Sequence, residues 1–222
     1  MGQTAVIIMA KSPQVGAVKT RLCPPLAPQT AAALYQAFLR DKIAQVRQLQ
    51  HGRPTIAYTP VDSQPFFAEL APDFLLIPQH GADLGERLVN CFAQCFAAGY
   101  TGVLATDSDS PNLPTDFLQQ AVQHLATPET DVVIGPSEDG GYYLIGLRAL
   151  HRELFDNIPW STAAVAAETR RRAEAKALSI AWLPPWFDID TAADLQRLHA
   201  MLARSTAVEP QHTRRFFREH TS

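Results

Sequence analysis

The chain has few cysteines and no long apolar run, and both deficits restrict what it can be. Only three of its 222 residues are cysteines, Cys23, Cys91 and Cys95. An odd number without paired spacing fits a reducing compartment rather than a disulfide framework. The longest strongly apolar run, residues 5–10, is far shorter than a membrane span. The opening residues also lack the basic segment and cleavage site of a signal peptide, so we expect a cytoplasmic protein without a membrane span.

An excess of positive charge is also missing. The chain has 19 Lys and Arg against 22 Asp and Glu, a net charge of -3. A general nucleic-acid-binding protein would be distinctly basic, so we expect no nucleic-acid partner. No G-x-G-x-x-G follows the first apolar segment, no G-x-S-x-G occurs, and no His or Cys group has zinc spacing. These absences argue against a dinucleotide-binding site, a hydrolase of the nucleophile-elbow type and a zinc site.

What is present is an alternation of strand and helix patterns. Buried strands are predicted at 4–10, 55–59, 74–78, 102–106, 131–135, 142–147 and 178–183. Helices are predicted at 28–50, 83–98, 114–126, 161–177 and 191–203, with a short helix allowed between the second and third strands. Repeated β–α–β order predicts an α/β fold, with a mainly parallel sheet covered by helices on both faces. Only turn residues separate the two strands after residue 131, which predicts a mixed sheet there.

The periodic pattern stops before the end of the chain. We therefore predict one domain over residues 1–203 and a polar C-terminal tail over residues 204–222. The tail is interpreted as loose. Phe216 and Phe217 allow a second interpretation, in which it docks on the domain or on a second subunit.

The loop after the first predicted strand is rich in cations. Lys11, Gly16, Lys19 and Arg21 lie in it, and no carboxylate stands between Lys11 and Arg21. Cations this close repel one another unless an anion lies among them. The first strand-to-helix loop of an open α/β sheet is also a common place for phosphates to bind. The loop is therefore a candidate phosphate-binding site.

Two pairs of carboxylates follow other predicted strands. Asp107 and Asp109 come after residues 102–106, and Asp188 and Asp190 precede the last predicted helix. Hard oxygen ligands at strand ends suit Mg²⁺ or Mn²⁺, which retain water and share phosphate oxygens. The alternative for the first pair is that it caps a turn. The alternative for Asp190 is a favourable interaction of its negative charge with the N-terminus of the following helix. We expect a metal role for the pairs.

Three further features are candidates for binding the second substrate. Gly140 and Gly141 allow close approach of a ligand to the backbone, although a hairpin turn explains them equally well. Asp139 beside them favours substrate binding. Trp160 is either an apolar wall for an acceptor or a core aromatic followed by Ser161 as a helix cap.

Six segments, taken in order, resemble a known family: KSPQVGAVKTRL, GADLGERL, DSPNLP, GPSEDGGYYLIGL, IPWST and DIDTAADL. They are similar to the nucleotide-diphospho-sugar transferase superfamily, which has the GT-A fold. Within it, the chain resembles the bacterial glycosyltransferase-like family once listed as a domain of unknown function, some of whose members are associated with arsenosugar biosynthesis. The resemblance covers about residues 4–203.

The resemblance implies a role for each matching residue. Lys19 and Arg21 would hold the phosphates of a nucleotide, with Lys11 and Gly16 shaping the loop, and Asp83 and Arg87 would help to fix the nucleotide. Asp109 would be the main metal ligand and Asp190 the second, which makes Lys19 and Asp109 the catalytic candidates. Asp139, Gly140 and Gly141 would face the acceptor or sugar. One departure is Asp107, where relatives commonly have Gly; it creates a D-x-D sequence typical of sugar-nucleotide glycosyltransferases.

We therefore predict a transferase that uses Mg²⁺ or Mn²⁺ and a nucleotide-activated donor. The preferred reaction is glycosyl transfer from a nucleoside diphosphate sugar to a small acceptor. The alternative is nucleotidyl transfer from a nucleoside triphosphate with release of pyrophosphate, because the Lys-Thr-Arg loop resembles that of phospholactate guanylyltransferase. A nucleotide-binding protein without turnover is a third hypothesis. The base, the sugar, the acceptor and the oligomeric state stay open.

Overall fold

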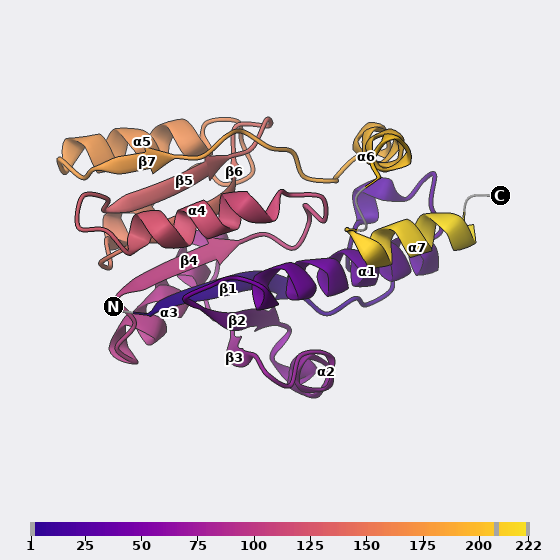
Figure 1. Ribbon diagram of the computed structural model, residues 1–222, viewed down its shortest axis with the longest axis horizontal. Coiled ribbons are helices and arrows are strands. Elements are labelled where there is room, and N and C mark those ends of the chain that lie inside the picture. The colour runs from indigo at the N-terminus through magenta and orange to yellow at the C-terminus, as the bar shows by residue number, and fades with distance from the viewer. Residues whose placement is uncertain (1–2, 207–208, 221–222) are drawn as a thin grey trace.

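The computed structural model describes residues 3–206 and 209–220 of the chain. Its centre is a seven-stranded sheet with the order β3-β2-β1-β4-β6-β5-β7 (Figure 1). The strands are β1 (Thr4–Lys11), β2 (Gly52–Thr59), β3 (Leu75–Pro78), β4 (Gly102–Thr106), β5 (Val132–Pro136), β6 (Tyr142–Leu147) and β7 (Ile180–Trp182). Strand β6 runs antiparallel to β4 and β5, and the other pairs are parallel. The predicted mixed, mainly parallel sheet is confirmed.

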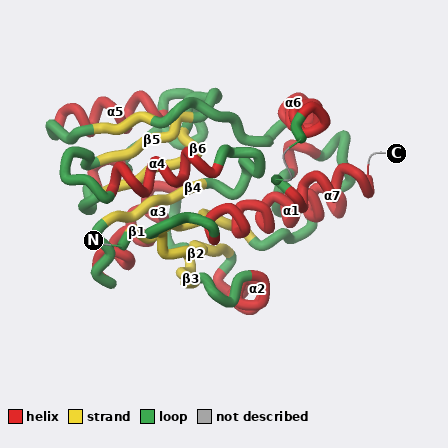
Figure 2. The backbone as a smooth tube through the Cα atoms, in the orientation of Figure 1, coloured by secondary structure: helices red, strands yellow, loops and turns green. Residues whose placement is uncertain are grey.

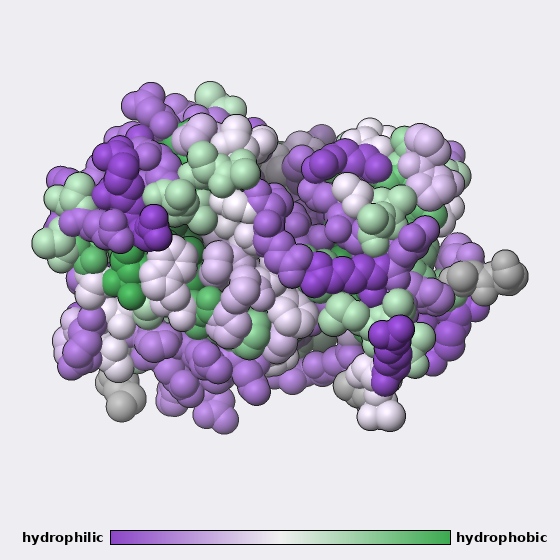
Figure 3. All heavy atoms as spheres, turned by 90° about the horizontal axis from the view of Figure 1, so that it is seen from above, coloured by the Kyte–Doolittle hydropathy of each residue, from purple (hydrophilic) through white to green (hydrophobic). Residues whose placement is uncertain are grey.

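Helices cover both faces of this sheet. They are α1 (Pro28–Arg47), α2 (Gln64–Leu70), α3 (Leu84–Ala97), α4 (Thr115–Leu125), α5 (Val165–Ala175), α6 (Ala192–Arg204) and α7 (Gln211–His220), with short 3₁₀ helices at Thr20–Leu22, Val61–Ser63 and Arg152–Leu154. None of the helices in the described part of the chain is long and apolar enough to cross a membrane. On the face seen in Figure 3, hydrophobic residues form patches among hydrophilic ones, as on most protein surfaces.

The alternation of side chains along β1 explains the two hydrophobic layers. Successive side chains of a strand point to opposite faces. Val6 and Ile8 pack in the layer that contains residues of α1, α2 and α4. Ala5 and Ile7 pack in the opposite layer with residues of α3 and α5. Because both faces of β1 are buried, residues 5–10 form a continuous apolar run, and the first exposed polar residue is Lys11 at the end of the strand.

The segment before α5 differs from the prediction. The helix begins at Val165 rather than near Ser161, which has a φ of 63° and does not cap the helix. The preceding turn packs instead on the β5–β6 connection, where Ala166 N donates to the Gly140 carbonyl at 2.9 Å. A Cβ atom on Gly140, whose φ is 91°, would collide with the backbone of Ala163. Gly140 is therefore explained by a close backbone contact.

The C-terminal region also differs from the loose tail that its composition suggests. Residues 211–220 form helix α7, which lies alongside α1 in Figures 1 and 2. Phe216 is 7% exposed and packs in a cluster that includes Phe38 of α1 and Leu198 of α6. The docking interpretation is therefore the one the structure shows, and the packed part of the chain continues past residue 203.

A buried carboxylate fixes the N-terminus of α7. Asp41 of α1 accepts hydrogen bonds from His212 N at 2.8 Å, from Thr213 N at 2.7 Å and from Thr213 Oγ1 at 2.6 Å. Burial raises the pKa of Asp41, and these hydrogen bonds oppose that rise. The capping group comes from a helix some 170 residues earlier, so no local sequence pattern reports it.

We expect Asp41→Ala to destabilise the protein by about 1–3 kcal/mol, because the donors of His212 and Thr213 lose their acceptor in a buried place. Asp73→Ala is the matched control. Asp73 pairs with Arg47 at 2.8 Å, but both side chains are nearly half exposed, so its loss is expected to cost about 0–1 kcal/mol. Urea denaturation measures both. An equal loss of stability in the two variants would contradict the role given to Asp41.

Candidate functional site

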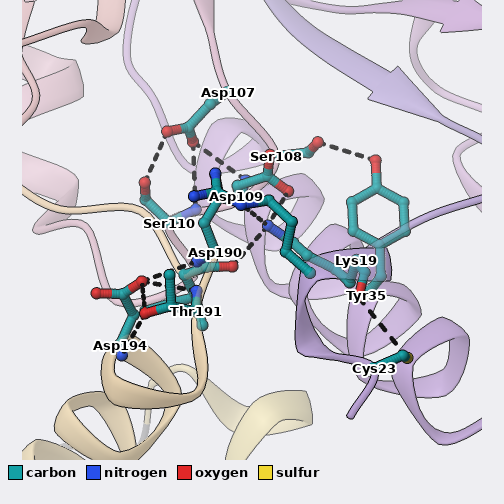
Figure 4. A network of polar contacts seen from close by, with 12 residues as sticks. Lys19, Cys23, Tyr35, Asp107, Ser108, Asp109, Ser110, Asp190, Thr191 and Asp194 are labelled. Carbon is teal, nitrogen blue, oxygen red and sulfur yellow. Dashed lines mark hydrogen bonds and ion pairs between the residues drawn. The ribbon is translucent and has the colours of Figure 1, made fainter. Parts of the chain in front are cut away.

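Lys19 lies at the centre of the candidate site. It follows β1, has a φ of 48°, and precedes the 3₁₀ turn at Thr20–Leu22. Its side chain is only 5% exposed, and its Nζ lies 2.8 Å from Asp109 Oδ1 and 3.1 Å from Asp190 Oδ1 (Figure 4). The same Nζ donates to the Ile189 carbonyl at 2.7 Å. One ammonium group therefore joins the loop after β1, the end of β4 and the segment before α6.

Neighbouring carboxylates stabilise the positive charge of Lys19. Burial alone would lower the pKa of Lys19, but the carboxylates of Asp109 and Asp190 outweigh burial and raise that pKa above its ordinary value. Arg21 adds a second cation, with Nη1 at 3.0 Å from Asp190 Oδ2, although its side chain is 69% exposed. The cluster thus balances two carboxylates with two cations.

A cleft of about 390 Å³ opens beside this cluster. Four cationic side chains line it: Lys11, Lys19, Arg21 and Arg87. Its oxygen-bearing lining side chains include Asp109, Asp190, Ser108 and Tyr35, and Gln79 and Leu84 also border it. Lys11 and Arg21 are exposed, so their charges reach solvent at the mouth of the cleft. A cleft that combines cations with hard oxygens matches the chemistry of a metal-bound polyphosphate.

The backbone around the cleft explains several of the predicted residues. Gly16 has a φ of 79°, and a Cβ atom there would have no neighbour within 4 Å, so its conformation rather than its surroundings favours glycine. Arg87 Nε donates to the Gly81 carbonyl at 3.1 Å. Asp83 is the N-cap of α3 and accepts from Glu86 N at 2.9 Å. Asp83 does not line the cleft, whereas Leu84 and Arg87 of the same helix do.

A chain of hydrogen bonds supports the floor of the cleft. Lys11 N donates to Tyr35 Oη at 3.0 Å, Tyr35 Oη lies 2.9 Å from Ser108 Oγ, and Ser108 Oγ donates to the Met9 carbonyl at 3.1 Å. Since the Ser108 hydrogen is directed to Met9, Tyr35 is the donor to Ser108. Burial raises the pKa of Tyr35 to about 12. The sequence places Tyr35 on an apolar helix face and gives no signal for this contact.

Asp107 is placed differently from Asp109. Its carboxylate accepts from Ser110 Oγ at 2.6 Å and from the backbone N of Asp109 and Ser110 at 3.3 Å each. Lys42 of α1, which is fully buried, lies 3.6 Å from it. Burial raises the pKa of Asp107 and lowers that of Lys42. Asp107 therefore holds its own turn, the alternative weighed from the sequence. Among the described contacts it makes no ion pair with Lys19, although the charges of Lys19 and Asp109 act on its pKa.

Asp139 and Asp188 belong to an acidic neighbourhood that adjoins the Lys19 cluster through Asp190. Asp139 accepts from Gly141 N at 2.9 Å within the β5–β6 turn. Burial raises the pKa of Asp188 to about 7, and the negative charges of Asp190, Asp107 and Asp139 add to that rise. Neither Asp139 nor Asp188 lines the larger cleft. Within residues 3–206 and 209–220, no group of three or more His, Cys, Asp or Glu side chains is arranged to hold a metal ion.

A smaller, mainly apolar cavity of about 200 Å³ adjoins the cleft. The two share Met9, Leu84, Ser108 and Asp109, and Leu88 and Tyr142 are among the further lining residues of the cavity. Trp160 does not line it but meets Tyr142 edge-on, with ring centroids 6.2 Å apart. A Cβ atom on Gly85 would lie 2.9 Å from Trp160 Nε1. Trp160 thus packs one layer behind the cavity, in line with the core-aromatic alternative weighed from the sequence.

The fold and the cleft at the carboxyl ends of the strands define the nucleotide-diphospho-sugar transferase fold class. A family model described as "Uncharacterized protein conserved in bacteria (DUF2064)" matches residues 42–162. The chain belongs to this family, as its sequence motifs indicate. A search of curated proteins finds no significant match.

Solved structures give the same fold. A Desulfovibrio desulfuricans protein provisionally described as a nucleotide-diphospho-sugar transferase is 34% identical, with a TM-score of 0.90 over 99% of this chain and 95% of that one. The CMP-2-keto-3-deoxy-manno-octonic acid synthetase complexed with CTP is 13% identical, with a TM-score of 0.58 over 91% and 99% of the two chains. A Mycobacterium tuberculosis protein solved with manganese is 15% identical, with a TM-score of 0.54 over 89% and 98%.

The raised pKa of Asp188 makes a prediction about stability. The ordinary pKa of Asp188 is 3.8 and its folded value is about 7, so the folded state binds more protons than the unfolded state between these values. Stability therefore falls as pH rises through this window. We expect Asp188→Asn, which carries no charge, to have a higher melting temperature than wild type at pH 8, with the gain shrinking as pH approaches 4. Asp62→Asn at an exposed position is the control, and a gain independent of pH would refute the prediction.

Proposed function

We propose that the protein is a transferase that uses a nucleotide-activated donor, with glycosyl transfer from a nucleoside diphosphate sugar to a small acceptor as the preferred reaction. The observation that carries this proposal is the Lys19 ammonium at the base of a cation-lined cleft, in contact with Asp109 and Asp190. Such a group can neutralise charge that develops on a departing diphosphate. The 34% identical relative, provisionally described as a nucleotide-diphospho-sugar transferase, supports the same class.

The residues of the cleft have distinct roles in this proposal. Lys19 and Arg21 bind the diphosphate, while Lys11 and Arg87 extend the positive surface along the nucleotide. The two carboxylates of Asp109 and Asp190 supply hard oxygens, which fits Mg²⁺ or Mn²⁺ shared with phosphate and water. When bound there, the metal would withdraw charge from the leaving diphosphate. The adjoining cavity beside Asp109 is the place for the acceptor or the transferred group.

Nucleotidyl transfer is the second candidate. A specific observation favours it: the synthetase complexed with CTP shares the fold over 91% of this chain. The D-x-D sequence also gives glycosyl transfer less support, because Asp107 holds its own turn and contacts Lys42. In the first reaction the acceptor attacks a sugar carbon and a nucleoside diphosphate leaves. In the second it attacks the α-phosphorus and pyrophosphate leaves.

The leaving group separates the two reactions. We expect slow release of nucleoside diphosphate from a nucleoside diphosphate sugar in the presence of Mn²⁺ or Mg²⁺, even with water as acceptor, because the proposed donor site does not need the true acceptor to form. Panels of sugar donors and of nucleoside triphosphates are incubated with the protein, and both products are quantified. Pyrophosphate from a triphosphate, with no diphosphate from any sugar donor, would establish the second candidate instead.

Asp109→Asn tests the proposed metal ligand. It removes a charge without removing volume, so we expect the fold to persist while metal-dependent turnover falls by about 100-fold or more. Circular dichroism and a melting curve check the fold, and Asp116→Asn on the exposed surface of α4 controls for loss of a carboxylate. Turnover equal to that of wild type at saturating Mn²⁺ would remove Asp109 from the proposed site.

A further inference from the structure

The Lys19 ammonium occupies the place where a cation between Asp109 and Asp190 would lie. Its Nζ is surrounded by three oxygens: Asp109 Oδ1 at 2.8 Å, Asp190 Oδ1 at 3.1 Å and the Ile189 carbonyl at 2.7 Å. Figure 4 shows the side chain directed between the two carboxylates. An ammonium group has three donors, so the three oxygens account for all of them.

A divalent cation and this ammonium cannot share the position. Lys19 is 5% exposed, so little water screens the repulsion between two positive groups a few ångströms apart. Asp190 is also neutralised from its other oxygen by Arg21 at 3.0 Å. The two carboxylates therefore already have cationic partners, and a metal ion held between Asp109 Oδ1 and Asp190 Oδ1 must displace the Lys19 ammonium.

We propose that Lys19 is an internal substitute for the metal, which yields its place only when a polyphosphate arrives to receive its ammonium. This inference rests on the proposed function, because it assigns the polyphosphate to the same cleft. The metal and the phosphates then bind together. The metal binds the carboxylates of Asp109 and Asp190, and the phosphates bind the Lys19 ammonium that was paired with them.

The surroundings of Lys19 allow this exchange. Lys19 itself lines the cleft of about 390 Å³, together with Lys11, Arg21 and Arg87, so space for an anion lies beside its Nζ. A lysine side chain is a long flexible stem with a compact charge and can redirect that charge by rotation about its own bonds. The phosphate oxygens replace the carboxylates as acceptors, and the carboxylates become available to the metal.

Reciprocal coupling follows from this exchange. If the phosphates increase the affinity for the metal by some factor, the metal increases the affinity for the phosphates by the same factor. Without phosphates, the protein is expected to bind a divalent ion more weakly than a site whose carboxylates have no cationic partner. Removal of the Lys19 charge abolishes the competition and is expected to strengthen the binding of the metal alone.

The test is the affinity for Mn²⁺ without nucleotide, measured from the electron paramagnetic resonance signal of free Mn²⁺. We expect Lys19→Met to bind Mn²⁺ at least about tenfold more tightly than wild type, since a unit charge in contact with both carboxylates is removed. Lys11→Met is the matched control: it removes the same charge from the same cleft, but Lys11 makes no ion pair among the described contacts. Lys11→Met is expected to change the Mn²⁺ affinity by less than about threefold, because solvent screens the exposed Lys11 charge.

A wild-type measurement covers the case in which Lys19→Met fails to fold. In crystals of the wild-type protein grown with Mg²⁺ and inorganic pyrophosphate, we expect Lys19 Nζ to lie beyond about 4 Å from Asp109 Oδ1, outside ion-pair distance, and to contact a phosphate oxygen. A structure that holds Mg²⁺ on Asp109 while Lys19 keeps both carboxylate contacts would overturn the proposal.

The results also distinguish this inference from the proposed function. Unchanged Mn²⁺ affinity in a folded Lys19→Met variant, or an equal gain in Lys11→Met, would overturn the exchange even if the wild-type protein turned over a nucleotide donor. Tighter Mn²⁺ binding specific to Lys19→Met would support the exchange even if none of the donors in the panels reacted.

Discussion

The arrangement of the site depends on one nearly buried positive charge. The Lys19 ammonium contacts Asp109, Asp190 and the Ile189 carbonyl, so three segments meet at it: its own loop after β1, the end of β4 and the segment before α6. A nearly buried ammonium group stays charged only if hydrogen-bond acceptors lie close to it. The contacts that keep it charged therefore also fix the loop after β1 relative to the end of β4, and both of these segments line the cleft.

The hydrophobic pattern was sufficient to predict much of the fold. The strands β1 and β4 are buried on both faces, so they read as uninterrupted apolar runs, and the polar residues directly after them lie at one edge of the sheet. That rule alone placed Lys19, Asp109 and Asp190 near one another, although their roles stay a prediction. It could not tell which way a carboxylate points: Asp83 and Asp107 also follow strands, yet one caps α3 and the other closes a turn.

Contacts between distant segments account for the rest of what the sequence did not reveal. Tyr35 has the spacing of a core residue, and its hydroxyl bond to Ser108 depends on the approach of α1 to β4. Helix α7 buries few apolar residues, Phe216 among them, so its pattern is nearly all polar, and its N-terminal partner is Asp41 on another helix. Local propensity carries no information about such partners.

The Lys19–Asp190 contact joins residues that lie 171 positions apart, and this separation has a consequence for the order of synthesis. A ribosome makes the chain from its N-terminus, so the cation-rich loop emerges long before the segment that carries Asp190. Until that segment follows, Lys19 has only Asp109 as a carboxylate partner, and Arg21 remains a solvated cation without Asp190. The nascent N-terminal half can form β1 and β2, but the site itself is a late product of translation, completed only when the last third of the protein folds back across the sheet.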